Sequence, residues 1–211
     1  MKDTFKKLKL KKDSQLILIN QDDDNFKNMN ALQKGGAQRM EKAVSEGVER
    51  NMINDSHFRG KVLDFGCGVG GSSYFFSLNQ ANVVAVELSN SIDELKKLDI
   101  LPKENIIHGD GLKLMRSFDE NSFDMVVAQM LGPDSEGDFI EVFYKEANRI
   151  LKQSGRILIT SDIGTIQQLN ARYINGYQYK GPRHDLFISY KHNDVDSLLQ
   201  QKFYRNTSKF K

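Results

Sequence analysis

Three glycines form the clearest chemical pattern in this sequence. Gly66, Gly68 and Gly71 follow residues 62–65, for which the sequence predicts a short buried strand, and precede residues 72–78, for which it predicts a helix. A strand, a glycine loop and a helix N-terminus in this order bring backbone N–H groups and the positive helix end together. Glycine also lets a ligand approach where a Cβ would clash. The G-x-G-x-x-G spacing alone is a weak indicator of a nucleotide-binding loop.

Two acidic residues narrow the choice of ligand. Glu87 ends the apolar run 83–86, at the position where an acid at a strand tip holds ribose hydroxyls. Asp64 lies two residues before the first glycine of the loop. Its carboxylate would repel a pyrophosphate but attract a ligand that carries an ammonium and a sulfonium, because opposite charges attract strongly in a partly dry site.

The segments D-F-G-C-G-V-G-G at 64–71 and A-V-E-L-S at 85–89 resemble motifs I and II of the class I methyltransferases that use S-adenosylmethionine. The resemblance covers residues 60–161. It implies an α/β fold with a single doubly wound, mostly parallel sheet and helices on both faces. Only one or two strands can be found after residue 163, so the sequence leaves a reduced C-terminal edge of the sheet open.

The resemblance implies a site for S-adenosylmethionine, with S-adenosylhomocysteine as the product. Asp64 and the glycine loop would hold the methionine end, and Glu87 would accept hydrogen bonds from two ribose hydroxyls. Asp110 would accept from the adenine amino group. The predicted cofactor-binding residues are Asp64, Gly66, Cys67, Gly68, Glu87, Leu88, Asp110, Gly111 and Gln129.

The methyl acceptor is expected above the fourth and fifth strands, near Leu131, Tyr173, Tyr177 and Tyr179. His184 is the candidate general base, needed only if the acceptor must lose a proton. Methyl transfer itself depends mainly on aligning the acceptor with an already activated methyl group.

Two methyltransferase subclasses are disfavoured by what the chain lacks. No Asn/Asp-Pro-Pro-aromatic motif stands at 129–133, where enzymes that modify base or glutamine nitrogens carry it. The only cysteine, Cys67, lies in the glycine loop, so the Pro-Cys nucleophile of cytosine C5 enzymes is absent as well. No metal is expected, because the fourth strand ends on Gln129 rather than an acid.

The composition is typical of one soluble domain. The chain has 211 residues, 39% of them hydrophobic and 27% charged, and no apolar run approaches the roughly 20 residues that a membrane helix needs. A single cysteine rules out an internal disulfide, and the first residues lack the apolar region of a secretory signal. A cytoplasmic location is the default expectation. The net charge of +2 does not indicate a nucleic-acid partner.

We expect residues 1–36 to form an N-terminal arm and a possible lid hinged at Gly35–Gly36, and residues 37–211 to form the methyltransferase-like domain. The sequence predicts a strand or hydrophobic strip at 15–19, a loop at 21–28, a helix over 37–52, a helix that ends near Gly155, a loop over 175–184 and a strand over 186–190.

The leading functional prediction is methyl transfer to O or N of a small molecule or short peptide. Three alternatives stay open: an RNA or protein methyltransferase that uses the basic termini, a nicotinamide oxidoreductase, and a module that binds S-adenosylmethionine without catalysis. The sequence does not indicate an oligomeric state.

Overall fold

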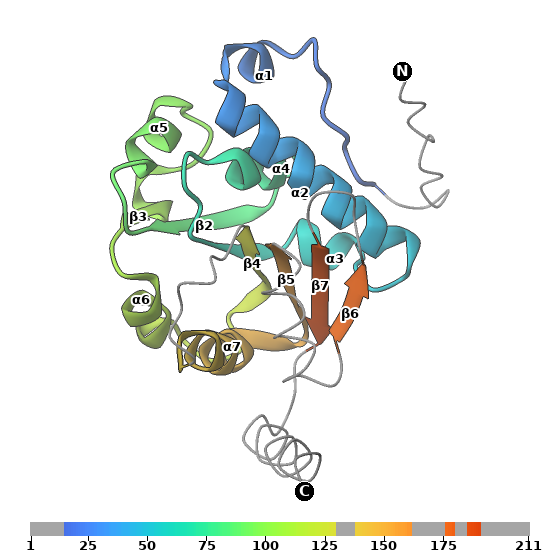
Figure 1. Cartoon of the computed structure of the whole chain (residues 1–211), viewed down its shortest axis with the longest axis vertical. Helices are drawn as coiled ribbons and strands as arrows, with labels where there is room; N and C mark the ends of the chain where they lie inside the picture. The colour runs from blue at the N-terminus through green and yellow to red at the C-terminus, as the bar shows by residue number, and fades with distance from the viewer. Residues whose placement is uncertain (1–14, 130–137, 162–175, 180–184, 191–211) are drawn as a thin grey trace, which may run out of the picture.

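A seven-stranded sheet organises the computed structural model, which describes residues 15–129, 138–161, 176–179 and 185–190. The strand order is β3-β2-β1-β4-β5-β7-β6. Figure 1 shows β3 and β2 on one side of the sheet and β5, β7 and β6 on the other. The first five strands are parallel, and β7 is antiparallel to both β5 and β6. The strands are β1 Lys61–Phe65, β2 Asn82–Glu87, β3 Ile106–His108, β4 Phe123–Gln129, β5 Leu151–Ser161, β6 Gly176–Tyr179 and β7 Asp185–Tyr190.

This topology confirms the doubly wound, mostly parallel sheet and corrects one expectation about it. The C-terminal edge is not reduced, because β6 and β7 complete it as an antiparallel pair. Segment 175–184 was predicted to be a loop, yet four of its residues form β6. A short stretch that contains Gly and Tyr can form an edge strand as well as a loop, because an edge strand pairs with a neighbouring strand on one side only.

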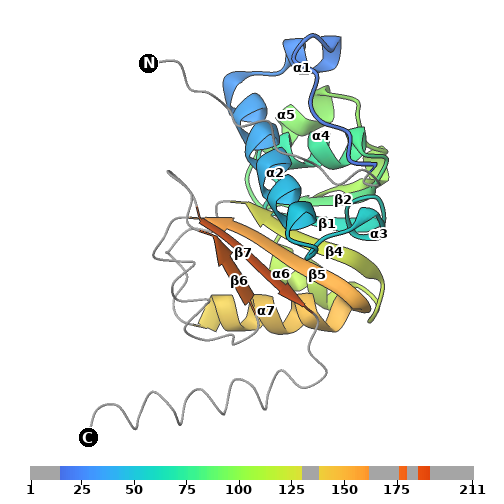
Figure 2. The ribbon, with the colours of Figure 1, turned by 90° about the vertical axis from the view of Figure 1, so that its right-hand side faces the viewer.

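Helices cover both faces of the sheet (Figure 2). Helices α2, α4 and α5 contribute to one hydrophobic cluster, and α6 and α7 contribute to the other. The helices are α1 Asp24–Asn28, α2 Ala31–Glu49, α3 Asp55–Phe58, α4 Gly71–Leu78, α5 Ile92–Lys97, α6 Gly111–Ser117 and α7 Asp138–Ile150, with a 3-10 turn at Lys103–Asn105. In the described residues, no helix has the length and apolarity needed to span a membrane.

In strand β1, alternate side chains point to opposite faces of the sheet, and this determines where Asp64 lies. Val62 packs in the cluster beneath α2 and α4, whereas Leu63 and Phe65 pack in the cluster beneath α7. Both faces of a parallel strand are covered by helices, so an apolar run is favoured throughout. Asp64 breaks that run on the face of α4, where it is fully buried.

Helix α2 begins six residues earlier than predicted. Asn30 caps it with a capping box, in which the Asn30 side chain accepts from the Gln33 N–H and the Gln33 side chain accepts from the Asn30 N–H. The helix continues through Gly35 and Gly36, so the hinge predicted there is wrong for this structure. The division into an arm at 1–36 and a domain at 37–211 stays a prediction, although its boundary falls inside α2.

Two further local expectations differ from the structure, and for segment 15–19 the structure favours the hydrophobic strip over the strand. The predicted loop at 21–28 contains α1, which Asp23 caps by accepting from the Phe26 N–H. Helix α7 ends at Ile150, so Gly155 lies within β5 instead of ending the helix. The strip at 15–19 is not a strand: Leu16 is buried, and the Asn79 side chain both donates to and accepts from the Ile17 backbone.

Candidate functional site

The glycine loop lies where the carboxyl ends of β1 and β2 meet. The Gly66 and Cys67 N–H groups donate to the Val86 carbonyl at 2.8 and 3.1 Å, which ties the loop to β2. Gly66 and Gly68 adopt φ of +66° and +54°, and a Cβ on either would meet nothing within 4 Å. A left-handed backbone beside open space is suited to close ligand approach. Gly71 differs, because a Cβ there would lie 2.8 Å from the Cα of Gly36.

Asp64 is buried directly beneath this loop. The hydroxyls of Ser72 and Ser73, in the first turn of α4, both donate to its Oδ2 at 2.7 and 2.6 Å. Its Oδ1 is buried and has no hydrogen-bond partner. Burial raises the pKa of Asp64 to about 6, the serine hydroxyls lower that pKa, and the negative charge of Glu87 raises it. The folded protein therefore holds an acid that a nearby cation would favour in its ionised form.

Glu87 ends β2 and reaches across to the loop. Its Oε2 accepts from the Gly68 N–H at 2.9 Å, and its Oε1 accepts from the Ser89 N–H at 2.7 Å. These two bonds fix the carboxylate beside the open glycines, and each oxygen retains a further lone pair. Leu88 follows it with 70% of its surface exposed.

Asp110 has a structural role besides the adenine contact that the resemblance implies. Its Oδ1 accepts from the N–H groups of Leu112 and Lys113 at 3.0 and 3.2 Å, so it is the N-cap of α6. Its Oδ2 lies 3.8 Å from the Lys113 Nζ. Gly111 is required for packing, since a Cβ there would clash with the Phe65 ring.

Cys67 is buried in the loop, and burial raises the pKa of its thiol. A thiol that stays protonated is a poor nucleophile. The structure therefore gives Cys67 a packing role within the loop and no activated thiolate.

Gln129, at the end of β4, closes the same edge of the sheet. Its Nε2 donates to the Gly36 carbonyl of α2 at 2.9 Å. Together these contacts bring Asp64, Gly66, Gly68, Glu87 and Gln129 to one edge, with α2 above them.

The sequence interpretation missed Gln33 as a residue of this site. Its Nε2 donates to the Val69 carbonyl of the glycine loop at 3.1 Å and to the Glu94 carbonyl of α5 at 3.3 Å. Gln33 is buried and thus ties α2 to two neighbouring segments. The Asn-x-x-Gln pattern at 30–33 was the available signal, since it is typical of a helix start.

The predicted acceptor residues are placed only in part. Leu131, Tyr173 and His184 lie outside the described residues. Tyr177 and Tyr179 belong to strand β6, whose backbone pairs with β7. Their roles stay predictions.

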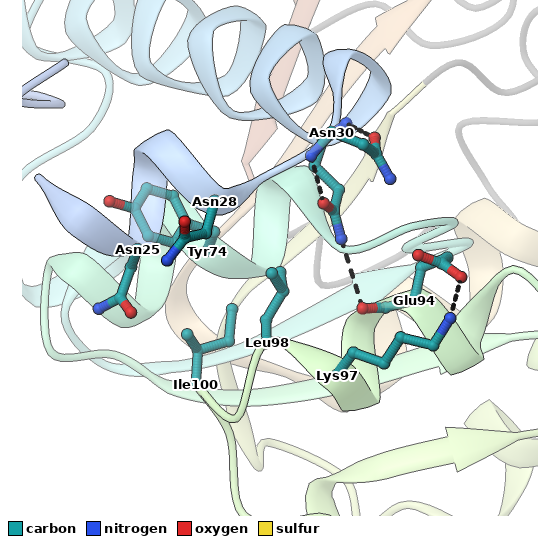
Figure 3. Close-up of a pocket in the computed structure, with 9 residues that line it drawn as sticks. Asn25, Asn28, Asn30, Tyr74, Glu94, Lys97, Leu98 and Ile100 are labelled. Atoms are coloured by element: carbon teal, nitrogen blue, oxygen red, sulfur yellow. Dashed lines mark hydrogen bonds and ion pairs between the residues drawn. The ribbon is translucent and has the colours of Figure 1, made fainter.

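A cavity of about 280 Å³ lies beside the candidate site between α1, α2, α4 and α5 (Figure 3). Gln33 lines this cavity, but none of the predicted cofactor-binding residues does. Its lining is mostly amide and charged side chains above Leu98 and Ile100: Asn25, Asn28, Asn30, Gln33, Tyr74, Glu94 and Lys97. The cavity is therefore separate from the open space at Gly66 and Gly68.

The strand order and the acid-flanked glycine loop define a Rossmann-like methyltransferase core. The sequence model of the family described as "Methyltransferase domain" matches residues 63–159. Over this region the chain is similar to the class I S-adenosylmethionine-dependent methyltransferases, and this similarity implies S-adenosylmethionine as the cofactor.

Known proteins agree with this assignment over the same region. The chain is 32% identical to a demethylmenaquinone methyltransferase of Staphylococcus aureus, over 46% of this chain and 41% of that protein. It is 34% identical to a sterol 24-C-methyltransferase of Aspergillus fumigatus, over 45% of this chain and 26% of that protein. The chain thus spans less than half the length of these relatives.

A solved structure shows the same fold. The Thermus thermophilus 16S rRNA N2 G1207 methyltransferase, in complex with AdoMet and guanosine, superposes with a TM-score of 0.57 at 21% identity. The match covers 74% of this chain and 43% of that chain. At this identity the likeness concerns the fold alone.

Proposed function

We propose that this chain transfers a methyl group from S-adenosylmethionine to O or N of a small molecule or short peptide. The observation that carries the proposal is the pair Gly66 and Gly68, whose missing Cβ atoms leave open space beside two carboxylates. S-adenosylmethionine, when bound, supplies a methyl group already activated by its sulfonium. The protein then has to bind, orient and shield the reactants.

The residues present fit this cofactor. Asp64 retains a buried, unpaired Oδ1, and its negative charge is felt strongly at the loop because little water screens it. That charge favours the ammonium of the methionine end over a pyrophosphate. Glu87 is held by two N–H groups and would accept from the ribose hydroxyls with its remaining lone pairs.

The adenine end would meet the residues that follow β2 and β3. Leu88 is exposed, and an apolar side chain beside the open loop would gain by covering an aromatic ring. The Asp110 side chain already caps α6 through Oδ1, so only Oδ2 is available to an adenine amino group. Gly111 would contribute its backbone.

The small-molecule part of the acceptor proposal is supported by the names of two relatives, which refer to a sterol and to demethylmenaquinone. Both are small molecules. One of the two names specifies a carbon atom as the methylated position. The test must therefore identify which atom of the acceptor is methylated.

Calorimetry with S-adenosylmethionine, S-adenosylhomocysteine and NADH tests the cofactor half of the proposal. We expect binding of the first two and no binding of NADH, because the Asp64 carboxylate repels a pyrophosphate. A mass-shift screen with S-adenosylmethionine and pooled acceptors then tests transfer: small molecules, short peptides and RNA in separate pools. Transfer only to RNA, with salt-dependent binding, would replace the small-molecule proposal. Cofactor binding without transfer to any pool would favour a non-catalytic module.

A further inference from the structure

The cavity between α1, α2, α4 and α5 lies outside the part of the site that the cofactor would use. Its volume is about 280 Å³, and none of the predicted cofactor-binding residues lines it. Small-molecule sites usually have about 300–1,000 Å³, so a ligand of this cavity would be small. Figure 3 shows Asn25 and Asn28 on one side of the cavity and the Glu94–Lys97 pair on the other.

The side-chain amides of Asn25 and Asn28 are available to a ligand. Both residues lie within α1, although asparagine is a poor helix former, and the helix is capped by Asp23 instead. Among the described residues, neither side chain makes a hydrogen bond. Both are exposed and line the cavity. Each amide therefore offers a ligand two N–H donors and one carbonyl acceptor.

Asn30 and Gln33 extend this amide wall from the start of α2. The Asn30 Oδ1 accepts from the Gln33 N–H at 3.0 Å, which leaves the Asn30 Nδ2 as a donor. Gln33 is fixed, because its Oε1 accepts from the Asn30 N–H and its Nε2 donates to the Val69 and Glu94 carbonyls. The free hydrogen-bonding groups of the wall thus belong to carboxamides, in which a donor lies beside an acceptor.

The lining residues offer no unpaired charge. Lys97 is the cation among them, and its Nζ forms an ion pair with the Glu94 carboxylate. The Asp23 carboxylate also lies beside the wall, since it accepts from the Tyr74 hydroxyl at 3.2 Å. A phosphate would face this carboxylate with no free cation among the lining residues to balance it. An uncharged ligand is therefore favoured.

Leu98 and Ile100 give the cavity an apolar floor. Both are half-buried and pack against the cluster that contains Phe26 and Tyr74. A flat ring that covers this floor would remove apolar surface from water, whereas a free sugar would place hydroxyl groups against it. A planar ring with a donor beside an acceptor on its edge suits both the floor and the amides. Nucleobases have this structure, and Asn or Gln amides pair with adenine through two hydrogen bonds.

We propose that this cavity binds the base of an uncharged nucleoside. The carboxamides of Asn25 and Asn28 contact the hydrogen-bonding edge of the base, and Leu98 and Ile100 contact its face. The site is additional to that of the cofactor, and the proposal does not rest on the proposed function. Gln33 belongs to both regions, because it lines the cavity and holds the glycine loop through Val69.

NMR titration tests the proposal through the side-chain amide signals of Asn25 and Asn28 and the methyl signals of Leu98 and Ile100. The probes are adenosine, guanosine, cytidine and uridine, with ribose, the nucleoside 5′-monophosphates and a short single-stranded RNA in parallel. S-adenosylhomocysteine is present in excess, so that adenosine does not occupy the cofactor site instead.

A double variant, Asn25→Ala with Asn28→Ala, removes the proposed contacts with the edge of the base. The control Gln38→Ala removes an exposed amide of α2 that does not line the cavity. The Leu98 and Ile100 methyl signals report binding in both variants, and circular dichroism confirms that each is folded.

We expect at least one nucleoside to shift the amide and methyl signals together and saturably. The double variant should bind this nucleoside about tenfold more weakly or worse, because the amide pairing with the base is lost. Gln38→Ala should bind it like the parent protein. Ribose should shift none of these signals, and the monophosphate should bind more weakly than the nucleoside.

The proposal is overturned if no nucleoside shifts these signals, or if the double variant binds like the parent. Stronger binding of the monophosphate or of the RNA would also overturn it, in favour of an anionic ligand. Failure of the proposed function is a separate result, in which the parent protein binds no S-adenosylhomocysteine. The Asn25 and Asn28 signals still report on the cavity in that case.

Discussion

Gly36 of α2 and Gly71 of α4 meet backbone to backbone, with no side chain between them. A Cβ on Gly36 would lie 3.2 Å from the Gly71 Cα, and a Cβ on Gly71 would lie 2.8 Å from the Gly36 Cα. The third glycine of the loop motif therefore serves helix packing, whereas Gly66 and Gly68 leave space for a ligand. Substitutions within a single motif should accordingly have two different effects.

Gly68→Ala and Gly71→Ala separate these effects. At Gly68 an added methyl group meets no protein atom, so we expect only the backbone strain of about 1–2 kcal/mol together with a large loss of S-adenosylmethionine affinity. At Gly71 the helices must move apart, so the loss of stability should be the larger of the two. Thermal unfolding and calorimetry measure both quantities. Normal cofactor binding by Gly68→Ala would mean that the loop does not hold the ligand.

Glu87→Ala should weaken S-adenosylmethionine binding by about 2–4 kcal/mol, because two charge-assisted hydrogen bonds would be lost. The variant also frees the Gly68 and Ser89 N–H groups, so a small loss of melting temperature is expected. Glu104→Ala, at an exposed acid before β3, is the matched control. Equal affinities of both variants and the parent, measured by calorimetry, would exclude Glu87 as the ribose acceptor.

The affinity for S-adenosylmethionine should depend on the ionisation of Asp64. Because the folded pKa is about 6, the carboxyl is ionised at about pH 7 and protonated at about pH 5. Loss of its negative charge should lower affinity for the cationic ligand by about tenfold over this range. Asp64→Asn should bind weakly with a flatter pH profile. A profile of the same slope in both proteins would assign the titration to another group.

The same ionisation affects the stability of the free protein with the opposite sign. The pKa of Asp64 is raised from 3.8 to about 6 on folding, so the folded state favours the protonated form. Stability should therefore decrease as the pH rises through this window, by at most about 3 kcal/mol. Denaturant unfolding at several pH values, with Asp64→Asn as the reference, measures this contribution.

Gln33→Leu should loosen the glycine loop without touching the ligand space directly. It removes the hydrogen bonds to the Val69 and Glu94 carbonyls and the one that Gln33 accepts from the Asn30 N–H, at a cost of about 1–3 kcal/mol. We expect a lower melting temperature and faster hydrogen exchange in the loop. Gln38→Leu, at an exposed position of the same helix, should change neither. Unaltered hydrogen exchange of the glycine loop in Gln33→Leu would contradict the inference that Gln33 holds this loop to α2.

Tyr177→Ala and His184→Ala test where the acceptor binds. We expect S-adenosylmethionine affinity to stay within about 1 kcal/mol of the parent, the usual range for a residue outside the site. Methyl transfer to the acceptor found by the screen should fall about tenfold or more for at least one variant. If both variants turn over like the parent protein, the acceptor does not bind near β6 or the segment after it.

The core strands could be predicted because their signal is local. Mostly apolar segments such as 62–65, interrupted by Asp64, and 83–86 are buried on both faces, as is typical of parallel strands, and the glycines after 65 mark where the first one ends. Strand β6 could not be predicted in this way. Its four residues become a strand by pairing with β7, and that pairing depends on distant parts of the chain.

In the candidate site, too, some residues could be predicted from local sequence, and others depend on contacts with distant parts of the chain. Asp64 and Glu87 could be chosen from their spacing to the glycines, since backbone connectivity fixes where those residues lie. The serines that hold Asp64 belong to the next helix, and Gln33 reaches the loop from a helix that precedes β1.

The strand order also has a consequence for how such a protein can be rebuilt. All the predicted cofactor contacts except Gln129 come from one continuous stretch of chain, residues 64–111, whereas the β4–β5–β7–β6 half of the sheet, with Gln129, is made from residues downstream. The junction between them, at 118–122, lies at the amino end of β4 and thus at the opposite edge from the glycine loop. Recombination at that junction would exchange the downstream half while preserving residues 64–111. The seam to be matched in such a chimera is the β1–β4 pairing, from Val62 with Met125 to Phe65 with Ala128.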